Sequence, residues 1–477
     1  MTPAPPPPST APTEHLGDTV SGPFRVENGA GAVSGRVGGR QRWWAAYALL
    51  PSGLARDVTF EVVGGRFTGV SAESPRGDAQ VLPGVVLPGL ANAHSHAFHR
   101  ALRGRTHDGG GTFWTWRERM YAVAARLDPD SYLALAAATY AEMALAGITT
   151  VGEFHYLHHA PGGVSYGDPN SMGEALRRAA ADAGIRLTLL DTCYVAGGLS
   201  GTGHSALDTT QKRFGDGDAD RWAERVSGLK ESAGMRVGAA VHSVRAVPRD
   251  QLSVVAGAAT GRPLHVHLSE QPAENDACQG FYRMTPAALL DVEGVLGPLT
   301  TAVHATHLAD DDIATLGRTH TTVCFCPTTE RDLADGIGPA RALHDAGSPL
   351  SLGSDQHAVI DLFEETRALE MHERLDSLQR GRFRPDELLL TATRHESLGW
   401  EHAGRLEIGA RADLVAVRLD SRRTAGTAPG QILMTATAAD VDTVVVDGRT
   451  VVAGGQHLLG DIGSLLQTAI DPLWESK

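Results

Sequence analysis

Lysine and cysteine are both scarce in this chain. Of its 477 residues, four are cysteine and three are lysine (Lys212, Lys230 and Lys477). Cysteines that are so few and so scattered exclude a disulfide framework and fit a reducing compartment, so we expect a cytoplasmic protein. Cys324 and Cys326 alternate within an apolar segment and are expected to be buried thiols.

The sequence also lacks a basic surface, a long apolar run and a secretory signal. Its formal net charge is −14 at pH 7, which excludes nucleic acid as a partner and attraction to anionic lipid. No apolar stretch approaches the roughly 20 residues of a membrane span, so no membrane partner is expected. The N-terminal residues are rich in Pro, Ser, Thr and Ala, without a basic or an apolar signal region. We therefore expect residues 1–20 to be a disordered tail.

What the sequence does contain is a regular alternation of short apolar and helix-like segments between residues 83 and 400. Continuous apolar segments predict parallel strands buried on both faces. Helical stretches such as 129–145, which ends near Gly147, separate them. Eight such strands predict a (β/α)8 TIM-type barrel, in which catalytic residues collect at the C-terminal ends of the strands. The expected strands are 85–90, 148–154, 186–190, 236–241, 264–268, 301–304, 322–326 and 349–353.

Residues 21–82 and 401–460 have a different pattern, with short alternating segments broken by glycine. This pattern predicts antiparallel strands. Neither region contains a convincing core of its own, so we expect the two ends of the chain to form one small β-sandwich beside the barrel. Residues 461–477 form a separate C-terminal segment. The expected strands of the two ends are 43–49, 58–63, 67–70, 413–417, 441–446 and 450–452.

Histidines and one aspartate stand at the ends of four of the expected barrel strands. His94 and His96, two residues apart in an extended segment, can point their side chains the same way. Imidazoles together with one carboxylate form the ligand set of a single borderline divalent ion with an open coordination position. The residues in this pattern are His94 and His96, His265 and His267, His304, and Asp355.

Only one of His265 and His267 needs to bind the ion. We choose His267, because it lies nearer the end of its strand and shortly before Glu270, and we interpret His265 as a packed histidine. Asp355 would supply the fourth, anionic ligand and can accept a proton from bound water. None of the three lysines stands at a strand end, where a carboxylated lysine would bridge two ions. Glu153 stands at a strand end and could bridge to a second ion, but one ion is the better interpretation.

Several stretches resemble the formimidoylglutamate deiminase family, in the mononuclear aminohydrolase branch of the amidohydrolase superfamily. The resemblance runs from residue 24 to residue 460. The metal ligands are shared by the whole superfamily, so the Phe-Trp-Thr-Trp-Arg and His-Ser-Val-Arg stretches are the specific ones. The stretches that carry the resemblance are His94-Ser95-His96-Ala97-Phe98, Phe113-Trp114-Thr115-Trp116-Arg117, Glu153-Phe154-His155-Tyr156, Val241-His242-Ser243-Val244-Arg245, His267-Leu268-Ser269-Glu270-Gln271 and His304-Ala305-Thr306-His307.

The resemblance implies hydrolysis of the small molecule N-formimidoyl-L-glutamate to N-formyl-L-glutamate and ammonia in histidine degradation. It also implies a homodimer with one Zn²⁺ per subunit. Glu270 would shuttle a proton, and His304 would assist the attacking hydroxide. Arg245 offers the planar fork suited to a carboxylate. Carried over residue by residue, the zinc ligands are His94, His96, His267 and Asp355, the catalytic residues are Glu270, His304 and Asp355, and the substrate is held by Tyr156, His242, Arg245 and His99.

Two positions depart from the family pattern. His99 stands where the family often has glutamine, and Gln356 stands where a small residue such as serine is usual. Both are expected to border the substrate and to affect specificity. The alternative function is a related zinc aminohydrolase that acts on a nucleobase or another amidine, but Arg245 and Tyr156 favour an acidic substrate. A barrel that has lost its metal is disfavoured, because all four ligands are present together with Glu270.

Overall fold

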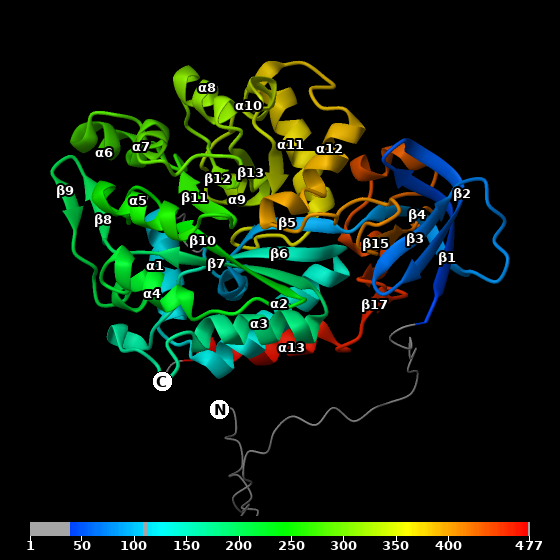
Figure 1. Ribbon diagram of the computed structural model, residues 1–477, viewed down its shortest axis with the longest axis horizontal. Helices are drawn as coiled ribbons and strands as arrows, with labels where there is room; N and C mark the ends of the chain where they lie inside the picture. Colours follow the sequence, from blue (N-terminus) through cyan, green and yellow to red (C-terminus); the bar gives the residue numbers. More distant parts are fainter. Residues whose placement is uncertain (1–38, 108–112, 476–477) are drawn as a thin grey trace, which may run out of the picture. The chain divides into compact units, whose positions relative to one another are not determined.

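The structure is a computed structural model that describes residues 39–107 and 113–475 (Figure 1). The tail expected at 1–20 lies outside the described residues, as does the first part of the 21–82 region. Eight parallel strands form one sheet in the order β14-β13-β12-β11-β10-β7-β6-β5. These strands are β5 (Leu90–Ser95), β6 (Ile148–His155), β7 (Arg186–Cys193), β10 (Met235–Val241), β11 (Leu264–Leu268), β12 (Thr300–His304), β13 (Thr322–Phe325) and β14 (Leu350–Leu352).

The parallel sheet closes into a barrel because its first and last strands also meet. The backbone N–H groups of Ser354 and Asp355 donate to the carbonyl oxygen of His94 at 3.1 and 3.0 Å. In return, the N–H of His96 donates to the carbonyl oxygen of Asp355 at 3.1 Å. The fold is therefore the predicted (β/α)8 barrel, and its closing seam lies between two of the histidines and the aspartate singled out above.

The helices follow the strands and cover the outside of the barrel (Figure 1). The helix expected at 129–145 is confirmed as α2 (Pro129–Leu145), which begins at a capping box of Asp128 and Ser131. Gly147 follows it with a φ of 87°, a conformation that glycine adopts easily. The others are α1 (Phe113–Ala124), α3 (Ser171–Ala183), α4 (Ala219–Ser227), α5 (Arg249–Ala258), α6 (Pro272–Tyr282), α7 (Pro286–Val292), α8 (Asp310–Arg318), α9 (Pro327–Asp332), α10 (Ala340–Ala346), α11 (Leu362–Ser377), α12 (Pro385–Ala392) and α13 (Ile462–Ile470).

The two ends of the chain combine as predicted, and their strands form a second sheet, which is mixed because β1 pairs with β4 in parallel where the sequence pattern predicted antiparallel strands. Its strand order is β18-β17-β16-β15-β4-β1-β2-β3, and it encloses a core of its own that includes Trp43, Phe60, Phe67 and Leu414. Its strands are β1 (Gln41–Leu50), β2 (Gly53–Val63), β3 (Arg66–Ser71), β4 (Gln80–Pro88), β15 (Leu414–Val417), β16 (Val441–Val446), β17 (Arg449–Ala453) and β18 (Gln456–His457).

The first barrel strand was placed wrongly by the sequence pattern. The expected strand 85–90 is divided between the two sheets, because β4 ends at Pro88 and β5 begins at Leu90. Gly89 stands at the crossing, where a Cβ atom would lie 2.3 Å from Oγ1 of Thr149. The apolar run is continuous because both sheets bury it, so hydrophobicity alone gave no boundary. As a result, His94 lies within β5 rather than after it.

All four cysteines are free and buried, and burial had been expected for Cys324 and Cys326. No helix in the described ranges combines the length and apolarity needed to cross a bilayer.

A buried ion pair joins the barrel to the mixed sheet. Arg186, the first residue of β7, donates from Nη1 to Oδ1 of Asp413 at 2.9 Å and from Nη2 to Thr150 at 3.0 Å. Asp413 stands immediately before β15, and both side chains are almost fully buried. Burial alone would raise the pKa of Asp413, but Arg186 outweighs that effect and holds the pKa below its usual value.

Arg186→Met is expected to lower the free energy of unfolding by about 3–5 kcal/mol, because it leaves Asp413 buried without its counter-ion. The paired carboxylate has a lowered pKa, so its stabilisation is present at neutral pH and is lost as the pH falls through that pKa. The difference between variant and parent should therefore shrink in acid. Urea unfolding followed by circular dichroism at neutral and acidic pH measures both effects. Arg405→Met, which breaks an exposed pair with Glu396, is the matched control, expected to cost less than about 1 kcal/mol. Equal losses in the two variants would contradict this account.

Candidate metal-binding active site

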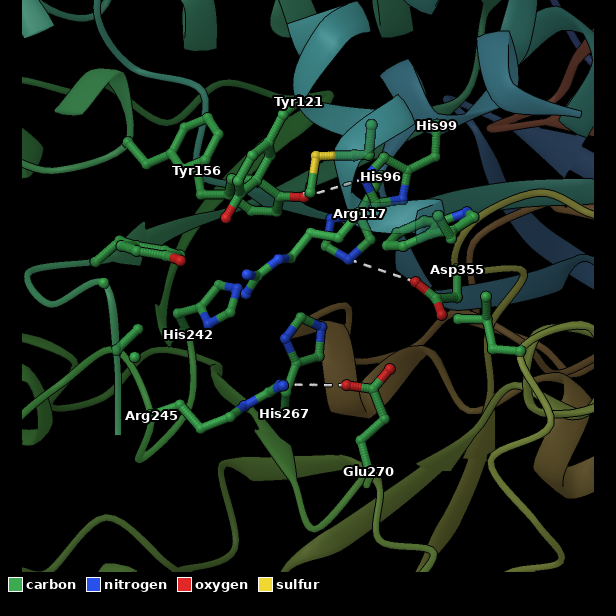
Figure 2. Close-up of a pocket in the computed structure, with 18 of the residues that line it drawn as sticks. His96, His99, Arg117, Tyr121, Tyr156, His242, Arg245, His267, Glu270 and Asp355 are labelled. Carbon is green, nitrogen blue, oxygen red and sulfur yellow. Dashed lines mark hydrogen bonds and ion pairs between the residues drawn. The ribbon is translucent and has the colours of Figure 1, made fainter. Parts of the chain in front are cut away.

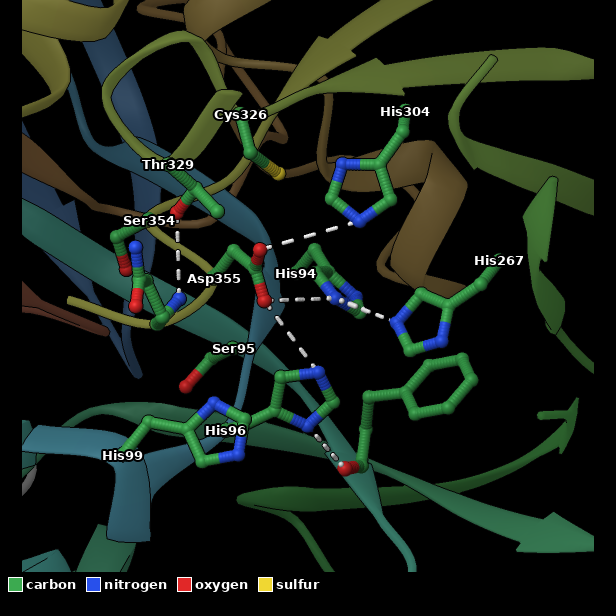
Figure 3. A network of polar contacts seen from close by, with 12 residues as sticks. His94, Ser95, His96, His99, His267, His304, Cys326, Thr329, Ser354 and Asp355 are labelled. Atoms are coloured by element: carbon green, nitrogen blue, oxygen red, sulfur yellow. Dashed lines mark hydrogen bonds and ion pairs between the residues drawn. The ribbon is translucent and has the colours of Figure 1, made fainter. Parts of the chain in front are cut away.

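Four of the predicted residues converge at the C-terminal ends of the barrel strands (Figure 3). Nε2 of His94 lies 3.1 Å from Nε2 of His267 and 3.3 Å from Oδ1 of Asp355. Nε2 of His96 lies 3.4 Å from the same oxygen of Asp355. His94 thus belongs to two groups of buried side chains, one with His96 and Asp355 and one with His267 and His304, and the ligand atoms within each group lie within 4.8 Å of one another, so each could hold a metal ion.

The surroundings of the imidazoles keep them neutral and fix their orientation. Nδ1 of His96 lies 2.9 Å from the carbonyl oxygen of Phe154, which can only accept a hydrogen bond. Nδ1 therefore carries the proton, and Nε2 keeps its lone pair. Burial, reinforced by the neighbouring His94, lowers the pKa of His96 to about 3. Burial also lowers the pKa values of His94 and His267 well below their usual range. The ring of Phe154 stacks on His267 with ring centres 4.2 Å apart.

The loops that present these side chains have a strained backbone. Ser269, His304, Asp355 and His357 have φ angles of 49°, 68°, 42° and 61°, in the left-handed region. Residues other than glycine seldom adopt that region, which costs each of them on the order of 1–3 kcal/mol. All four residues stand at or just after the ends of β11, β12 and β14. Such strain is typical of residues whose positions are fixed by a functional site.

His304 lies among carboxylates at the edge of the cluster. Its Nε2 is 3.9 Å from Oε1 of Glu270 and 3.9 Å from Oδ2 of Asp355, and its Nδ1 is 3.6 Å from Oε1 of Glu330. Burial would lower its pKa, but the three carboxylates outweigh that effect and raise the pKa to about 10. His304 is thus held as a hydrogen-bond donor, unlike the three neutral imidazoles.

A cavity of about 250 Å³ opens beside the cluster (Figure 2). His242 and Tyr156 line its far wall, and His99 lies 3.0 Å from the hydroxyl of Tyr156. Arg245 contacts Oε2 of Glu270 at 3.2 Å. It also contacts Oε2 of the fully buried Glu274 at 3.1 Å. The cavity beside the histidine cluster is thus bordered by the Arg245 guanidinium and is large enough for a small metabolite.

The structure brings together all the residues named above as metal ligands, catalytic residues or substrate contacts. Apart from His94, which is fully buried beneath the cavity, they all line it: His96, His99, Tyr156, His242, Arg245, His267, Glu270, His304 and Asp355.

Three other residues considered from the sequence have hydrogen-bond partners outside the cluster. Nε2 of His265 lies 3.0 Å from the carbonyl oxygen of Ser397, so this nitrogen is engaged outside the cluster. Glu153 accepts from Oγ of Ser95 at 2.7 Å and from the N–H of Ala97 at 2.6 Å, so its carboxylate is engaged.

Gln356 was expected beside the substrate, but it donates to Oδ2 of Asp332 at 2.8 Å and does not line the cavity. Asp332 at the end of α9 therefore determines where the amide points. A side chain that follows a ligand in sequence does not have to follow it into the pocket.

Residue-by-residue reasoning missed the wall contributed by α1. Trp116, Arg117, Met120 and Tyr121 all line the cavity. Their spacing of three and four residues places them on one face of a helix, so helical periodicity across the Phe-Trp-Thr-Trp-Arg stretch could have found them. Figure 2 shows the Arg117 side chain extending across the pocket toward His242. Tyr194 and Phe214, which complete this wall, carried no comparable signal.

Comparisons with known proteins agree with the geometry. A family model described as the amidohydrolase family matches residues 85–451. The chain is 36% identical over 436 residues to formimidoylglutamate deiminase of Pseudomonas aeruginosa, an alignment that covers 87% of this chain and 95% of that protein. It is 30% identical over 394 residues to 8-oxoguanine deaminase of the same organism, covering 80% and 85%. The crystal structure of an amidohydrolase from Brucella melitensis superposes with a TM-score of 0.85 at 31% identity, covering 91% of this chain and 100% of that one.

Proposed function

This chain is a hydrolase that belongs to the amidohydrolase family, and from that premise we propose that it hydrolyses N-formimidoyl-L-glutamate to N-formyl-L-glutamate and ammonia. The observation that carries the substrate assignment is the presence of two guanidinium groups, Arg117 and Arg245, in the cavity beside the histidine cluster. A substrate with two carboxylates needs such cations, whereas a neutral nucleobase does not. The 36% identity to a formimidoylglutamate deiminase supports the same substrate.

The donor set fits one zinc ion per subunit. Zinc favours neutral imidazole nitrogens together with a carboxylate oxygen, and the proposed ligands are His94, His96, His267 and Asp355. The contact between His96 and the carbonyl oxygen of Phe154 is the kind that orients a zinc-bound histidine. When bound, zinc supplies Lewis acidity and lowers the pKa of water to about 7.

The side chains around this point would move the protons of the reaction. Water adds to the formimidoyl carbon, the bond from that carbon to the terminal nitrogen breaks, and the nitrogen leaves as ammonia. Asp355 takes the proton that the attacking water loses. The terminal nitrogen gains both protons of the water, one as water adds and one as the bond breaks, and Glu270 delivers them as a general acid does. His304 donates a hydrogen bond to the oxygen on which negative charge develops.

The remaining cavity residues would hold the two carboxylates of the substrate. Arg245 contacts Glu270, so a carboxylate bound to Arg245 lies close to the proton donor. Tyr156, His242 and His99 complete the wall around it. Arg117 is added to the residues proposed from sequence, because it enters the same cavity from α1.

Ammonia release from N-formimidoyl-L-glutamate by the purified, zinc-loaded protein tests this proposal. We expect turnover of this substrate, loss of turnover on chelation, and recovery when zinc is restored. Adenosine, guanine, cytosine and 8-oxoguanine serve as parallel substrates. Turnover of one of these, without turnover of the glutamate derivative, would reject the substrate while keeping the metal-dependent reaction class.

We extend the proposal to a cytoplasmic homodimer. The resemblance to the family supports the dimer, and the low cysteine content supports a reducing compartment. Light scattering during size-exclusion chromatography would give the mass of the assembly, and a monomer would reject the dimer.

A further inference from the structure

A buried glutamine lies behind the cavity wall that is opposite the proposed metal ligands. Gln211 lies in a short 3₁₀ turn and is 2% exposed. Its Nε2 is 3.1 Å from the hydroxyl of Tyr121, 3.1 Å from the hydroxyl of Tyr194 and 3.0 Å from the carbonyl oxygen of Gly197. Tyr121, Tyr194 and Gly197 all line the cavity, whereas Gln211 lies behind them.

The orientation of the Gln211 amide is fixed by two backbone groups whose roles are unambiguous. The N–H of Asp208 can only donate, and it lies 2.9 Å from Oε1. The carbonyl oxygen of Gly197 can only accept, and it faces Nε2. The side chain of Asp208 in turn accepts from the N–H of Gln211 at 2.8 Å. A Cβ atom on Gly197 would lie 2.3 Å from the carbonyl oxygen of Ala206, so only glycine allows this close approach.

This orientation determines the direction of the tyrosine hydroxyls. Nε2 has two N–H groups and no lone pair; one N–H serves the carbonyl oxygen of Gly197 and the other is shared by Tyr121 and Tyr194, so neither hydroxyl can donate to Nε2. Their own protons must point elsewhere. Even if one hydroxyl donates to the other, at least one O–H remains to donate into the cavity. Hydrogen bonds in a chain polarise one another, so a phenol that accepts from an amide is a better donor.

The same wall also carries positive charge. The Arg117 guanidinium lies over the ring of Tyr121, with Cζ 5.5 Å from the ring centre. The guanidiniums of Arg245 and Arg117 both act to lower the pKa of His242, after the larger effect of burial. Both arginines therefore lie near His242. Oriented hydroxyl donors next to a guanidinium form a site for an acceptor-only anionic group, which is what an ionised carboxylate is.

We propose that Gln211 is a positioning residue that directs the hydroxyls of Tyr121 and Tyr194 toward the distal carboxylate of the substrate. This inference rests on the proposed function. The α-carboxylate of N-formimidoyl-L-glutamate is attached to the carbon that bears the reacting group, so it lies near Arg245 and Glu270. The distal carboxylate is two methylene groups further away, and this wall, built from α1 and from residues 194–214, contributes no residue to the metal cluster.

Two substrates that differ only in the distal group test the inference. N-formimidoyl-L-norvaline has a methyl group where the glutamate derivative has its distal carboxylate. In Gln211→Glu, a side chain of the same shape accepts from the tyrosine hydroxyls and turns their protons away from the cavity. We expect the KM for the glutamate derivative to rise roughly 10- to 100-fold with little change in kcat. For the norvaline derivative, kcat/KM should change at least tenfold less. A uniform loss with both substrates would overturn the inference.

Tyr121→Phe and Tyr194→Phe provide a second set of variants that keep the shape of the wall. Each should weaken binding of the glutamate derivative more than that of the norvaline derivative. When Gln211→Glu is added to the double variant, it should cause almost no further rise in KM. Thermal unfolding of every variant separates a folding defect from a binding defect. If Gln211→Glu retains its full effect in the double variant, the hydroxyls are not its route of action and the inference fails. Absence of turnover by the parent protein would instead reject the proposed function.

Discussion

Asp355→Asn is expected to lower kcat/KM for N-formimidoyl-L-glutamate by about 1,000-fold or more. Asparagine keeps the shape of the side chain, but it loses the charge that faces His94 and His96 at 3.3 and 3.4 Å. It also cannot take a proton from water. Because one residue combines both roles, zinc content and turnover should fall together. Ammonia release and elemental analysis of the purified protein measure the two quantities.

Asp386→Asn provides a matched control for the loss of one negative charge. Asp386 lies on α12 with 69% of its side chain exposed, paired with Arg384. We expect its zinc content and its kcat/KM to equal those of the parent. If Asp355→Asn retained full activity at normal zinc content, its assignment as both ligand and proton acceptor would be wrong.

Glu270→Gln is expected to lower kcat by about 100- to 10,000-fold while zinc content is unchanged. Glu270 lies 3.9 Å from His304 and lines the cavity, but it does not belong to the cluster that faces the metal point. Glutamine cannot deliver a proton to the leaving nitrogen. The loss should therefore appear in kcat, under saturating substrate, rather than in metal binding.

Glu274→Gln distinguishes proton delivery from simple support of Arg245. Both Glu270 and Glu274 contact that arginine, at 3.2 and 3.1 Å, but Glu274 does not line the cavity. We expect Glu274→Gln to raise KM and to leave most of kcat. Matching kinetic losses in the two variants would show that Glu270 acts only through Arg245.

Much of the barrel could be predicted because its strands follow a simple physical rule. A parallel strand covered on both faces is apolar throughout, and every residue of β6 and β7 is buried. Polar residues at the ends of such strands then stand out, as His267 and His304 did. The closing β-strands of the barrel bring these ends together without any further information from the local sequence.

The parts that could not be predicted depend on contacts between distant segments. At Gly89, where the chain changes sheets, Thr149 and Asp413 leave no room for a Cβ atom. Nothing in the apolar run itself indicates these contacts. Gln211 looks like an ordinary polar residue until its partners Tyr121 and Tyr194 are known. A side chain that acts through others has no sequence pattern of its own.

The seam between β5 and β14 affects how the protein is made. His94 and His96 are translated early and Asp355 late, so the proposed zinc site cannot form on a nascent chain until nearly the whole barrel has left the ribosome. An ion bound there would link the first barrel strand to the last, in addition to the few backbone hydrogen bonds that join them. Amide hydrogens at this junction should therefore exchange faster than those of β6 and β7 when zinc is withheld. Metal loading would then act as the final step of folding, not as an addition to a finished barrel.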